Sequence, residues 1–329
     1  PCKVRVARTS KVTGRAGAQL VAQGSEHFLL PLVREPTAGA VVSDAKPVGA
    51  RSDDAGEAKL ATGGKAEIIE LPIDDSWARD IGPTFLKNSR GRLSGVQWQF
   101  NGWGERYPSH AEDSMLARRV LEILALPAFE APIVCEGGAF HSDGQGTLLA
   151  TEQCLLNVNR NPTADKEDIE RCFALYIGAR KVIWLGAGFA DDETDGHVDN
   201  IACFAAPGKV VLGVPAMKSH PDFSAISEAR RRLEQARDAE GRAFEIVELP
   251  QPKKIRVRDD GRLTPASYVN FYLVNGAVIM PAFDNANDEP ARSVLTSCFP
   301  DRDIMQIEAL DIIAGGGGIH CLTQQEPKS

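Results

Sequence analysis

The stretch KVIWLGAGFADDETDGHVDNIACFAAPGKVVLGVP, residues 181–215, shows the plan on which most of the chain is built. An apolar run leads into a loop rich in glycine and aspartate, and two more apolar runs follow, separated by the turn APGK. Short apolar runs joined by such a turn are typical of a β-hairpin. The same plan recurs at residues 67–100, 131–157 and 244–283. This internal repeat predicts a modular architecture.

Segments between the repeats have the apolar spacing of helices. They are residues 112–125, 165–177 and 222–242. We expect Asp113 or Ser114 to cap the first of these helices, and the last helix to end before Gly241. A fifth unit is expected to begin near residue 302. Strand repeats that alternate with helices predict an α/β fold.

Residues 1–65 differ from the rest of the chain. They are rich in alanine, glycine, serine and lysine, and they lack both the strand and the helix period. We expect an atypical N-terminal segment, irregular or disordered in part, ahead of a main domain at residues 66–329. We also expect this segment to supply few or no strands to the last unit, which would leave a strand edge open.

Chemically reactive side chains fall at matching places in the repeats. Asp80, Glu136 and His197 follow one another at intervals of 56 and 61 residues, and Cys321 lies 124 residues beyond His197, about twice the period. Equivalent loops in a ring of repeats point at a common axis, so we expect these residues to converge. Asp199 should join them, because on a strand it would face the same side as His197.

The residue types suggest covalent chemistry on a cationic substrate. Cys321 follows four glycines, residues 315–318, which allow a close backbone approach. A nucleophilic thiolate is favoured by a nearby cation, for which His320 and a bound guanidinium are candidates. His197 suits general acid and base catalysis because its pKa lies near neutrality. The structural alternatives are an inert buried cysteine and a histidine satisfied within a hairpin.

Two further acids have similar alternatives. Trp77 lies three residues before Asp80, and a ring face and a carboxylate can hold one cation together, although a solvated turn would also explain this segment. Glu136 precedes two glycines, which suit a pocket, but a surface acid after a strand would be unremarkable. We expect His141 to be structural.

Composition narrows the class of protein. The net charge of −8, from 37 basic and 45 acidic residues, argues against nucleic-acid binding and favours a cationic ligand. No apolar run is long enough to span a membrane, and no secretory pattern is visible. Seven dispersed cysteines without a C-x-x-C pair predict reduced thiols and a cytoplasmic protein. Neither a close histidine pair nor a phosphate loop is found, so we expect no metal and no cofactor.

Five motifs together resemble those of the agmatine deiminases, which belong to the guanidino-group-modifying superfamily along with the bacterial peptidylarginine deiminases. They are DDSWARDIGPTF, EGGAFHSDGQGTLLATEQCLLNVNRNP, DETDGHVDNIACF, ASYVNFYLVNGAVIMPAF and GGGGIHCLTQQEP. The likeness covers residues 66–327. It implies a five-bladed pseudo-symmetric α/β propeller of ββαβ-type repeats around a central active site. It also implies cofactor-free hydrolysis of agmatine to N-carbamoylputrescine and ammonia, a step of putrescine and polyamine metabolism.

By motif position, the resemblance implies that Cys321 is the nucleophile and His197 the acid and base. Asp80, Glu136 and Asp199 would be the carboxylates around the guanidinium, with Trp77 and Glu193 as further substrate-binding residues. Two departures from the family stand out. The family usually has asparagine where this chain has Gly318, which predicts a looser nucleophile loop, and residues 1–65 do not look like the family's N-terminal region.

Three other functions remain open from the sequence. A peptidylarginine deiminase would need an open cleft for a polypeptide, and a non-catalytic descendant would follow if the altered N-terminus disabled the ring. A cysteine peptidase using Cys321 and His197 is disfavoured, because three acids near the nucleophile would oppose a developing oxyanion.

We expect Glu193 and its acidic neighbours to select the terminal amine of agmatine. The expected partner is this small cationic guanidine, and a homodimer is compatible with the sequence.

Overall fold

The computed structural model describes residues 68–253 and 263–327, together with the backbone of four short strands nearer the N-terminus. These strands are β1 (Lys3–Val6), β2 (Leu20–Gln23), β3 (Leu30–Arg34) and β4 (Ala45–Val48). In this part of the chain, no helix combines the length and the apolar character that crossing a membrane requires.

The first repeat unit shows how hairpins and helices combine. Strands β5 (Thr84–Lys87) and β6 (Leu93–Gln99) form an antiparallel hairpin. Helix α4 (Asp113–Ile123) then carries the chain across, and β7 (Ala128–Val134) pairs with β6 in parallel. A parallel pair needs such a crossover, whereas a short turn suffices for the antiparallel pair. The unit is therefore a ββαβ arrangement.

Three more units repeat this pattern of an antiparallel hairpin, a helix and a parallel third strand. They consist of β8 (Phe140–Ser142), β9 (Thr147–Thr151), α6 (Lys166–Ile177) and β10 (Lys181–Leu185); of β11 (Ala202–Ala206), β12 (Lys209–Val214), α7 (Phe223–Gln235) and β13 (Glu245–Pro250); and of β14 (Tyr272–Val274), β15 (Ala277–Ala282), α8 (Asp288–Cys298) and β16 (Asp303–Glu308). The α/β class expected from the sequence is confirmed.

The expected unit boundaries are displaced by one strand. The apolar run that opens residues 181–215 is β10, which closes the second sheet instead of opening the third. Likewise β16, placed at the start of a fifth unit, pairs with β15 in the fourth sheet. The apolar pattern locates each strand, but it does not reveal which neighbour the strand hydrogen-bonds with.

A fifth three-stranded sheet joins the two ends of the described chain. Strand β17 (Gln324–Glu326) pairs in parallel with β3, and β3 pairs in antiparallel with β4. Two strands from residues 1–65 thus complete this sheet, and the expectation that the segment would supply few or no partners needs correction. The first strand of the hairpin is central in this sheet, whereas the second strand of the hairpin is central in the other four. The side-chain packing of β3 and β4 lies outside the described residues.

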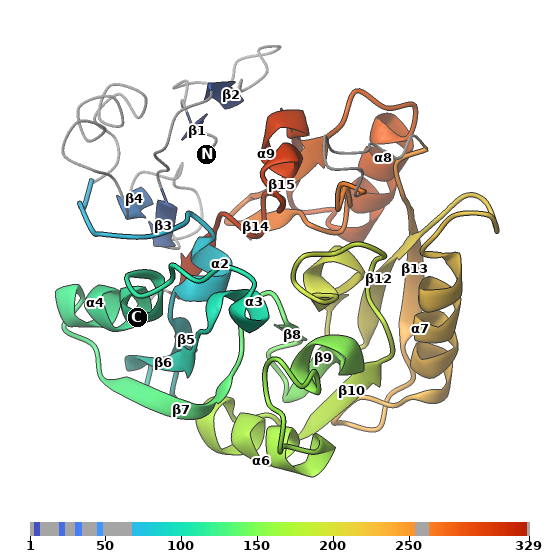
Figure 1. Ribbon diagram of the computed structural model, residues 1–329. Coiled ribbons are helices and arrows are strands. Elements are labelled where there is room, and N and C mark those ends of the chain that lie inside the picture. Colours follow the sequence, from blue (N-terminus) through green and yellow to red (C-terminus); the bar gives the residue numbers. More distant parts are fainter. Residues whose placement is uncertain are drawn as a thin grey trace.

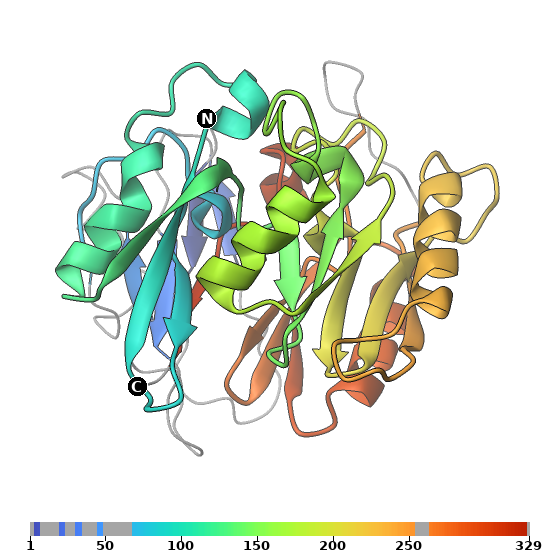
Figure 2. The same ribbon diagram turned by 90° about the horizontal axis from the view of Figure 1, so that it is seen from below.

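Figure 1 shows the four ββαβ sheets following one another around a common centre, with α4, α6, α7 and α8 on the outside. Seen from below, α4, α6 and α7 again cover the sheets from the outside (Figure 2). The later helices pack against the last strand of the preceding sheet, α6 on β7, α7 on β10 and α8 on β13. Each helix therefore links two neighbouring units.

The apolar core lies between neighbouring units. Trp98 of β6 contacts Phe140 of β8 and Phe173 of α6 edge to face, with ring centroids 5.8 and 5.7 Å apart. Aromatic pairs of this geometry add stability beyond the area they bury, about 0.5–1.5 kcal/mol each. The first and second units are thereby held at a fixed separation.

The start of α4 has a different role from the one expected. Its N-cap residue is Glu112, which makes no side-chain cap. The carboxylate of Asp113 instead accepts hydrogen bonds from the backbone N–H groups of Asp74 and Asp75, with Oδ1 2.7 Å from the nitrogen of Asp74. The capping prediction for Asp113 or Ser114 is therefore wrong. Trp77 lies two residues after Asp75, so Asp113 helps to position the segment that carries Trp77 and Asp80.

Candidate active site

The candidate residues lie in connections between sheets. Asp80 lies on the short helix α2 (Ala78–Ile81) ahead of β5, and Glu136 lies between β7 and β8. His197 and Asp199 lie between β10 and β11, and Cys321 lies between β16 and β17. All five side chains are buried. The structure brings them together at the centre, although the chain separates them widely.

His197 lies between two carboxylates. Its Nδ1 is 3.7 Å from Asp80 Oδ1 and its Nε2 is 3.6 Å from Glu136 Oε2, each just beyond ordinary hydrogen-bond distance. Burial lowers the pKa of His197, but Asp80, Cys154 and Glu136 outweigh burial and raise this pKa well above its usual value. The imidazole is therefore protonated at neutral pH and can donate a proton.

The local backbone around His197 is not the expected strand. Val198–Asn200 form a 3-10 turn, η1, with His197 at its N-terminus. Asp195 and Gly196 precede it with φ values of 60° and 91°, which break any extended run. The two side chains reach the centre because the N–H of Asp199 donates to the carbonyl of Gly138 at 3.3 Å, and alternation along a strand has no part in it.

Asp80 is fixed by two donors. Its Oδ2 accepts from Trp103 Nε1 at 2.9 Å and its Oδ1 accepts from the backbone N–H of Gly138 at 2.9 Å. Burial raises the pKa of Asp80 to about 6, while His197 and the Trp103 hydrogen bond act in the opposite direction. At neutral pH this carboxylate is charged and oriented.

The backbone of Gly138 lies close to three functional side chains of the site. A Cβ atom at this position would lie 2.5 Å from His197 Nδ1, 2.9 Å from Asp80 Oδ1 and 3.1 Å from Asp199 Oδ2. Only a residue without a side chain leaves these three groups where they are.

We therefore expect Gly138→Ala to lower kcat/KM at least about tenfold, because one added methyl group displaces the three groups that converge on it. Steady-state kinetics on agmatine would measure the loss. Gly144→Ala is the matched control, since a Cβ there meets no atom within 4 Å. The φ of Gly144 is +71°, so this control measures the effect of backbone strain without any steric clash. Equal losses in the two variants would contradict the steric argument.

Glu136 lies behind His197. Its Oε1 accepts from Arg160 Nε at 2.7 Å in an ion pair whose side chains are both 0% exposed. Its Oε2 faces His197 and lies 4.0 Å from the Sγ of Cys154. Burial raises the pKa of Glu136, but Arg160 and His197 outweigh burial and lower it below the usual value. Glu136 is thus a permanent negative charge beside the imidazole.

Cys321 faces Asp199. Its Sγ lies 3.7 Å from Asp199 Oδ2 and 3.4 Å from Asn270 Nδ2. Burial and the charges of Asp199 and Asp80 raise the pKa of Cys321 well above its ordinary value, although N–H donors of Gly318 and Asn270 act in the opposite direction. Without a cation bound, the thiol therefore stays protonated at neutral pH.

His320 does not provide that cation. Burial, Arg79 and His197 lower the pKa of His320 well below its usual value, so the imidazole is neutral. Its Nδ1 lies 2.8 Å from Asp199 Oδ2. The expectation that His320 favours the thiolate by charge is wrong, which leaves a bound guanidinium as the remaining candidate. His141 is likewise neutral, with its pKa lowered by burial to about 3, as suits a structural histidine.

The nucleophile loop is tightly held. The N–H of His320 donates to Asn270 Oδ1 at 2.9 Å, and the carbonyl of Cys321 accepts from the backbone N–H of Arg79 at 3.0 Å. A Cβ on Gly318 would lie 2.2 Å from Asn270 Oδ1. In this structure glycine is what allows the close contact, so the expected loosening of the loop by Gly318 is not found.

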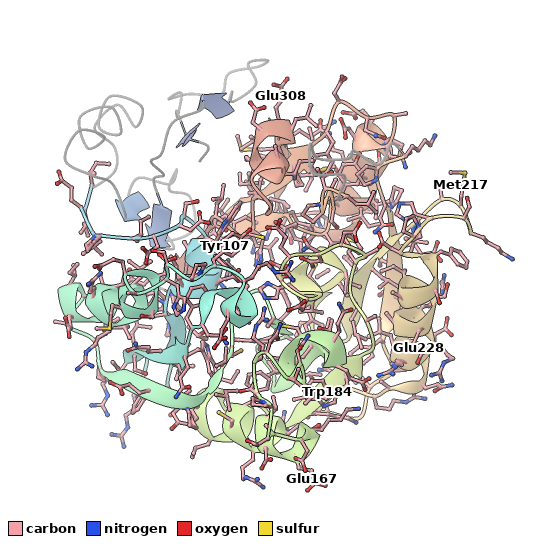
Figure 3. All side chains as sticks on the ribbon, viewed as in Figure 1. Tyr107, Glu167, Trp184, Met217, Glu228 and Glu308 are labelled. Atoms are coloured by element: carbon pink, nitrogen blue, oxygen red, sulfur yellow. The ribbon has the colours of Figure 1, made fainter. Side chains whose placement is uncertain are left out.

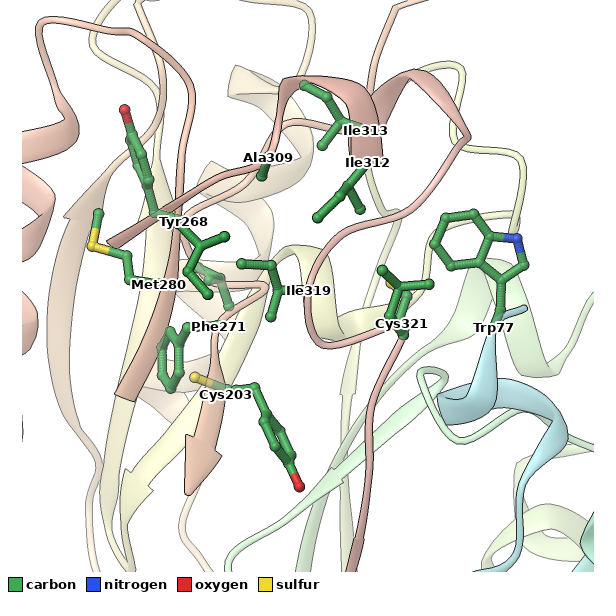
Figure 4. Close-up of a cluster of buried hydrophobic side chains, with 14 of the residues drawn as sticks. Trp77, Cys203, Tyr268, Phe271, Met280, Ala309, Ile312, Ile313, Ile319 and Cys321 are labelled. Atoms are coloured by element: carbon green, nitrogen blue, oxygen red, sulfur yellow. The ribbon is translucent and has the colours of Figure 1, made fainter. Parts of the chain in front are cut away.

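A narrow cavity reaches the site from one side. Its lining consists of Trp77, Asp80, Trp103, Tyr107, Glu193, Thr194, His197, Asn200, Gly315, Gly316, Gly317 and Cys321. Trp77 and Cys321 lie side by side at its wall (Figure 4). Tyr107 donates a hydrogen bond from its hydroxyl to Glu193 Oε2 at 2.6 Å. Tyr107 is exposed and lies nearer the middle of the view in Figure 3 than Glu167 and Met217, which lie at the edge.

Of the residues singled out from the sequence, Trp77, Asp80, Glu193, His197 and Cys321 line this cavity. Glu136 and Asp199 lie beside His197 and Cys321 respectively, as described above. Their roles as direct substrate contacts stay predictions.

Several residues of the site were not singled out from the sequence. Asn270 is the clearest case, because it fills the gap in the repeat spacing: it lies between β13 and β14, 51 residues before Cys321. The doubled interval from His197 to Cys321 was the signal that could have located it. Trp103 lines the cavity and holds Asp80, whereas Arg160 and Arg79 act through other residues. The spacing of these three residues gives no comparable signal.

Within the described part of the chain, one group of side chains has the chemistry of a metal site. Glu136, Cys154 and His197 place one ligand atom each within 4.8 Å of one another. The six cysteines in the described residues are all free thiols, as expected from their dispersal.

The chain belongs to the family of Porphyromonas-type peptidyl-arginine deiminases, whose model matches residues 38–327. Among its relatives, the agmatine deiminase of Pseudomonas syringae pv. tomato is 41% identical over 281 residues, which cover 79% of this chain and 76% of that protein. The structure is similar to that of the agmatine deiminase of Enterococcus faecalis, with a TM-score of 0.83, 35% identity and coverage of 86% of this chain and 83% of the other. It is also similar to a substrate-bound C. jejuni agmatine deiminase with a cysteine-to-serine change, with a TM-score of 0.76, 25% identity and coverage of 84% and 80%.

Proposed function

We propose that this protein hydrolyses agmatine to N-carbamoylputrescine and ammonia through a covalent amidino-cysteine intermediate. One observation carries the proposal: a buried thiol, an imidazolium and charged carboxylates surround the inner part of a cavity that has a further acid, Glu193, in its wall. Agmatine carries a guanidinium at one end and an ammonium at the other, so it matches this distribution of charge. The names of the relatives support the same substrate.

Binding is proposed to use charge at both ends. Asp80 and Asp199 accept hydrogen bonds from the planar guanidinium, which fixes its plane and turns its carbon toward Cys321 Sγ. Glu193, held by Tyr107, binds the ammonium. The indole rings of Trp77 and Trp103 exclude water from the charged groups between them.

The bound guanidinium also activates the nucleophile. Its positive charge offsets those of Asp199 and Asp80, so it lowers the pKa of the Cys321 thiol, and Asp199 Oδ2 at 3.7 Å is placed to take the proton. The bound substrate therefore supplies the positive charge that the free site lacks beside Cys321.

The reaction then proceeds in two halves. Sulfur attacks the guanidinium carbon, the C=N electron pair moves to nitrogen, and His197 gives its proton to the departing nitrogen, so the C–N bond breaks and ammonia leaves. Neutral His197 next removes a proton from water, which attacks the same carbon. The C–S bond breaks as the hydroxyl proton of the adduct passes to the departing sulfur, which releases the ureido product and restores the Cys321 thiol. Asp199 then loses to solvent the proton that it took from Cys321. Glu136 acts through His197 by keeping the imidazole charged in the first half.

The acid side of the pH profile should report Asp80. Because the pKa of Asp80 is about 6, kcat/KM should fall as the pH drops through this value and the carboxylate loses its charge. Trp103→Phe removes a donor that stabilises the charged form, so the acid limb should move to higher pH. Trp98→Phe is the control, because its indole N–H donates to Thr84 in the core. An unchanged limb in Trp103→Phe would remove Asp80 from this assignment.

The test of the function is ammonia release from agmatine, free arginine and a peptidyl-arginine, measured side by side. We expect agmatine to be the preferred substrate, since the cavity is narrow and has an acid where the carboxylate of arginine would lie. Preference for the peptide would indicate a peptidylarginine deiminase. No release from any of the three would indicate a non-catalytic descendant.

Further proposals follow from family membership. The five three-stranded sheets are proposed to be the blades of a pseudo-symmetric propeller, and residues 66–329 its deiminase domain. Free thiols suit a protein of the cytoplasm. The homodimer stays a prediction, which the mass of the protein in solution would test.

A further inference from the structure

We propose that Glu136, Cys154 and His197 form a binding site for a thiophilic divalent cation such as Zn²⁺. Glu136 and His197 lie in the connections before and after the second unit, and Cys154 lies within that unit. The three side chains are almost fully buried, with His197 1% exposed and the other two 0%. Cys154 lies on helix α5 (Glu152–Leu155) and has no role in the reaction proposed above.

The distances suit a small ion. Glu136 Oε2 lies 3.6 Å from His197 Nε2 and 4.0 Å from Cys154 Sγ. In a tetrahedral zinc site with bonds of about 2.0–2.3 Å, ligand atoms lie about 3.3–3.8 Å from one another. The two distances to Glu136 therefore lie within a few tenths of an ångström of those in a zinc site, and all three ligand atoms lie within 4.8 Å of one another. A water molecule would take the fourth position.

The donor set favours zinc over harder ions. One thiolate, one imidazole and one carboxylate match the preference of Zn²⁺ and related transition metals, whereas Mg²⁺ and Ca²⁺ prefer oxygen alone. Neither ring nitrogen of His197 has a hydrogen-bond partner among the described residues, so no hydrogen bond has to break before Nε2 exchanges its proton for an ion.

The surroundings supply the outer contacts that metal ligands usually have. Asp80 Oδ1 lies 3.7 Å from the second ring nitrogen of His197, and Arg160 holds the second oxygen of Glu136 at 2.7 Å. Such partners orient the ligands of a metal. Binding of the ion would release two protons, one from the imidazolium of His197 and one from the thiol of Cys154. These protons carry away two positive charges, which equals the charge of the divalent cation. The site therefore keeps its net charge.

Occupation of the site would inhibit the enzyme, a consequence that rests on the proposed function. With a metal on Nε2, His197 is a neutral, metal-bound imidazole and no longer the imidazolium that gives a proton to the departing nitrogen. The cavity touches His197, so an ion reaches the site by the route that the substrate uses.

Co²⁺ is the probe, because a cobalt–thiolate bond gives a charge-transfer absorption band that needs no enzymatic activity. Titration of the metal-free protein with Co²⁺ should produce this band, and Zn²⁺ should abolish it. Cys154→Ala and Cys154→Ser should both lose the band and bind Zn²⁺ at least about tenfold more weakly. Cys321→Ala should keep it, as should Cys172→Ala, which removes another buried thiol outside the cluster.

A band that persists in both folded Cys154 variants, or that disappears in Cys321→Ala, would overturn the proposal and assign the metal to the nucleophile. Absence of any band in the wild-type protein would also overturn it. The inhibition is measured separately, as ammonia release with increasing Zn²⁺. A protein that binds Co²⁺ through Cys154 but never deiminates agmatine would keep the metal site and contradict the proposed function.

Discussion

Cys321→Ser should lower kcat on agmatine by at least about a thousandfold while the protein stays folded and still binds its substrate. A serine hydroxyl has a far higher pKa than a thiol, so the bound guanidinium and Asp199 cannot convert it to the nucleophilic anion. The hydrogen bonds that hold the loop come from backbone groups of Cys321 and His320, and the substitution leaves them in place. Binding of agmatine to the variant can be measured by calorimetry.

The same assignment predicts a trapped intermediate. Acid quenching of the wild-type protein during turnover should leave an amidino group on Cys321, which intact-mass analysis and peptide mapping would detect. Cys298→Ser is the matched control, because this thiol lies at the end of α8, outside the cavity, and its replacement should leave turnover unchanged. A serine variant with near wild-type activity, or an adduct on another cysteine, would end the role of Cys321 as the nucleophile.

Asp80→Asn should lower kcat/KM about a hundredfold or more. Both carboxylate oxygens of Asp80 accept hydrogen bonds, from Trp103 and from the N–H of Gly138, so one of these donors would face the amide –NH₂ of asparagine. The substitution also removes a negative charge from the guanidinium and from His197. The pKa of His197 should then fall toward its usual value, and the pH profile of kcat should change accordingly.

Asp238→Asn provides the comparison for this variant. Asp238 is also buried, but it accepts hydrogen bonds from its own turn at Glu240 and Arg242. The control should lower the melting temperature without lowering kcat/KM more than about twofold. Asp80→Asn with near wild-type activity would show that the carboxylate does not contact the substrate.

Local patterns explain which parts of the fold could be predicted. The helix at Lys166–Ile177 was recognisable because its apolar spacing lies within one short segment. The hairpins were recognisable for the same reason. The sheet to which β10 or β16 belongs was not, because a parallel partner lies beyond a helix and the strand itself looks the same in either pairing.

The residues of the site likewise divide into those that local sequence patterns reveal and those that depend on contacts in the folded chain. Asp80, Glu136, His197 and Cys321 could be found because each occupies a matching place in a repeat and carries reactive chemistry. Asn270 occupies such a place too, but an amide alone does not indicate a function. The neutral state of His320 depends first on its burial and then on its proximity to Arg79 and His197 in the folded chain, so its position beside Cys321 in the sequence was misleading.

The clamp between Arg79 and the nucleophile loop affects how the protein folds. Arg79 donates from its backbone to Cys321 and from its guanidinium to Gln324, which lies 245 positions further along the chain. Contacts across such a separation form late, because the intervening chain must lose much of its conformational entropy before the two segments can meet. On refolding from denaturant, the helical signal of the separate units should therefore return before deiminase activity, since the nucleophile reaches its working position only when these two distant segments meet.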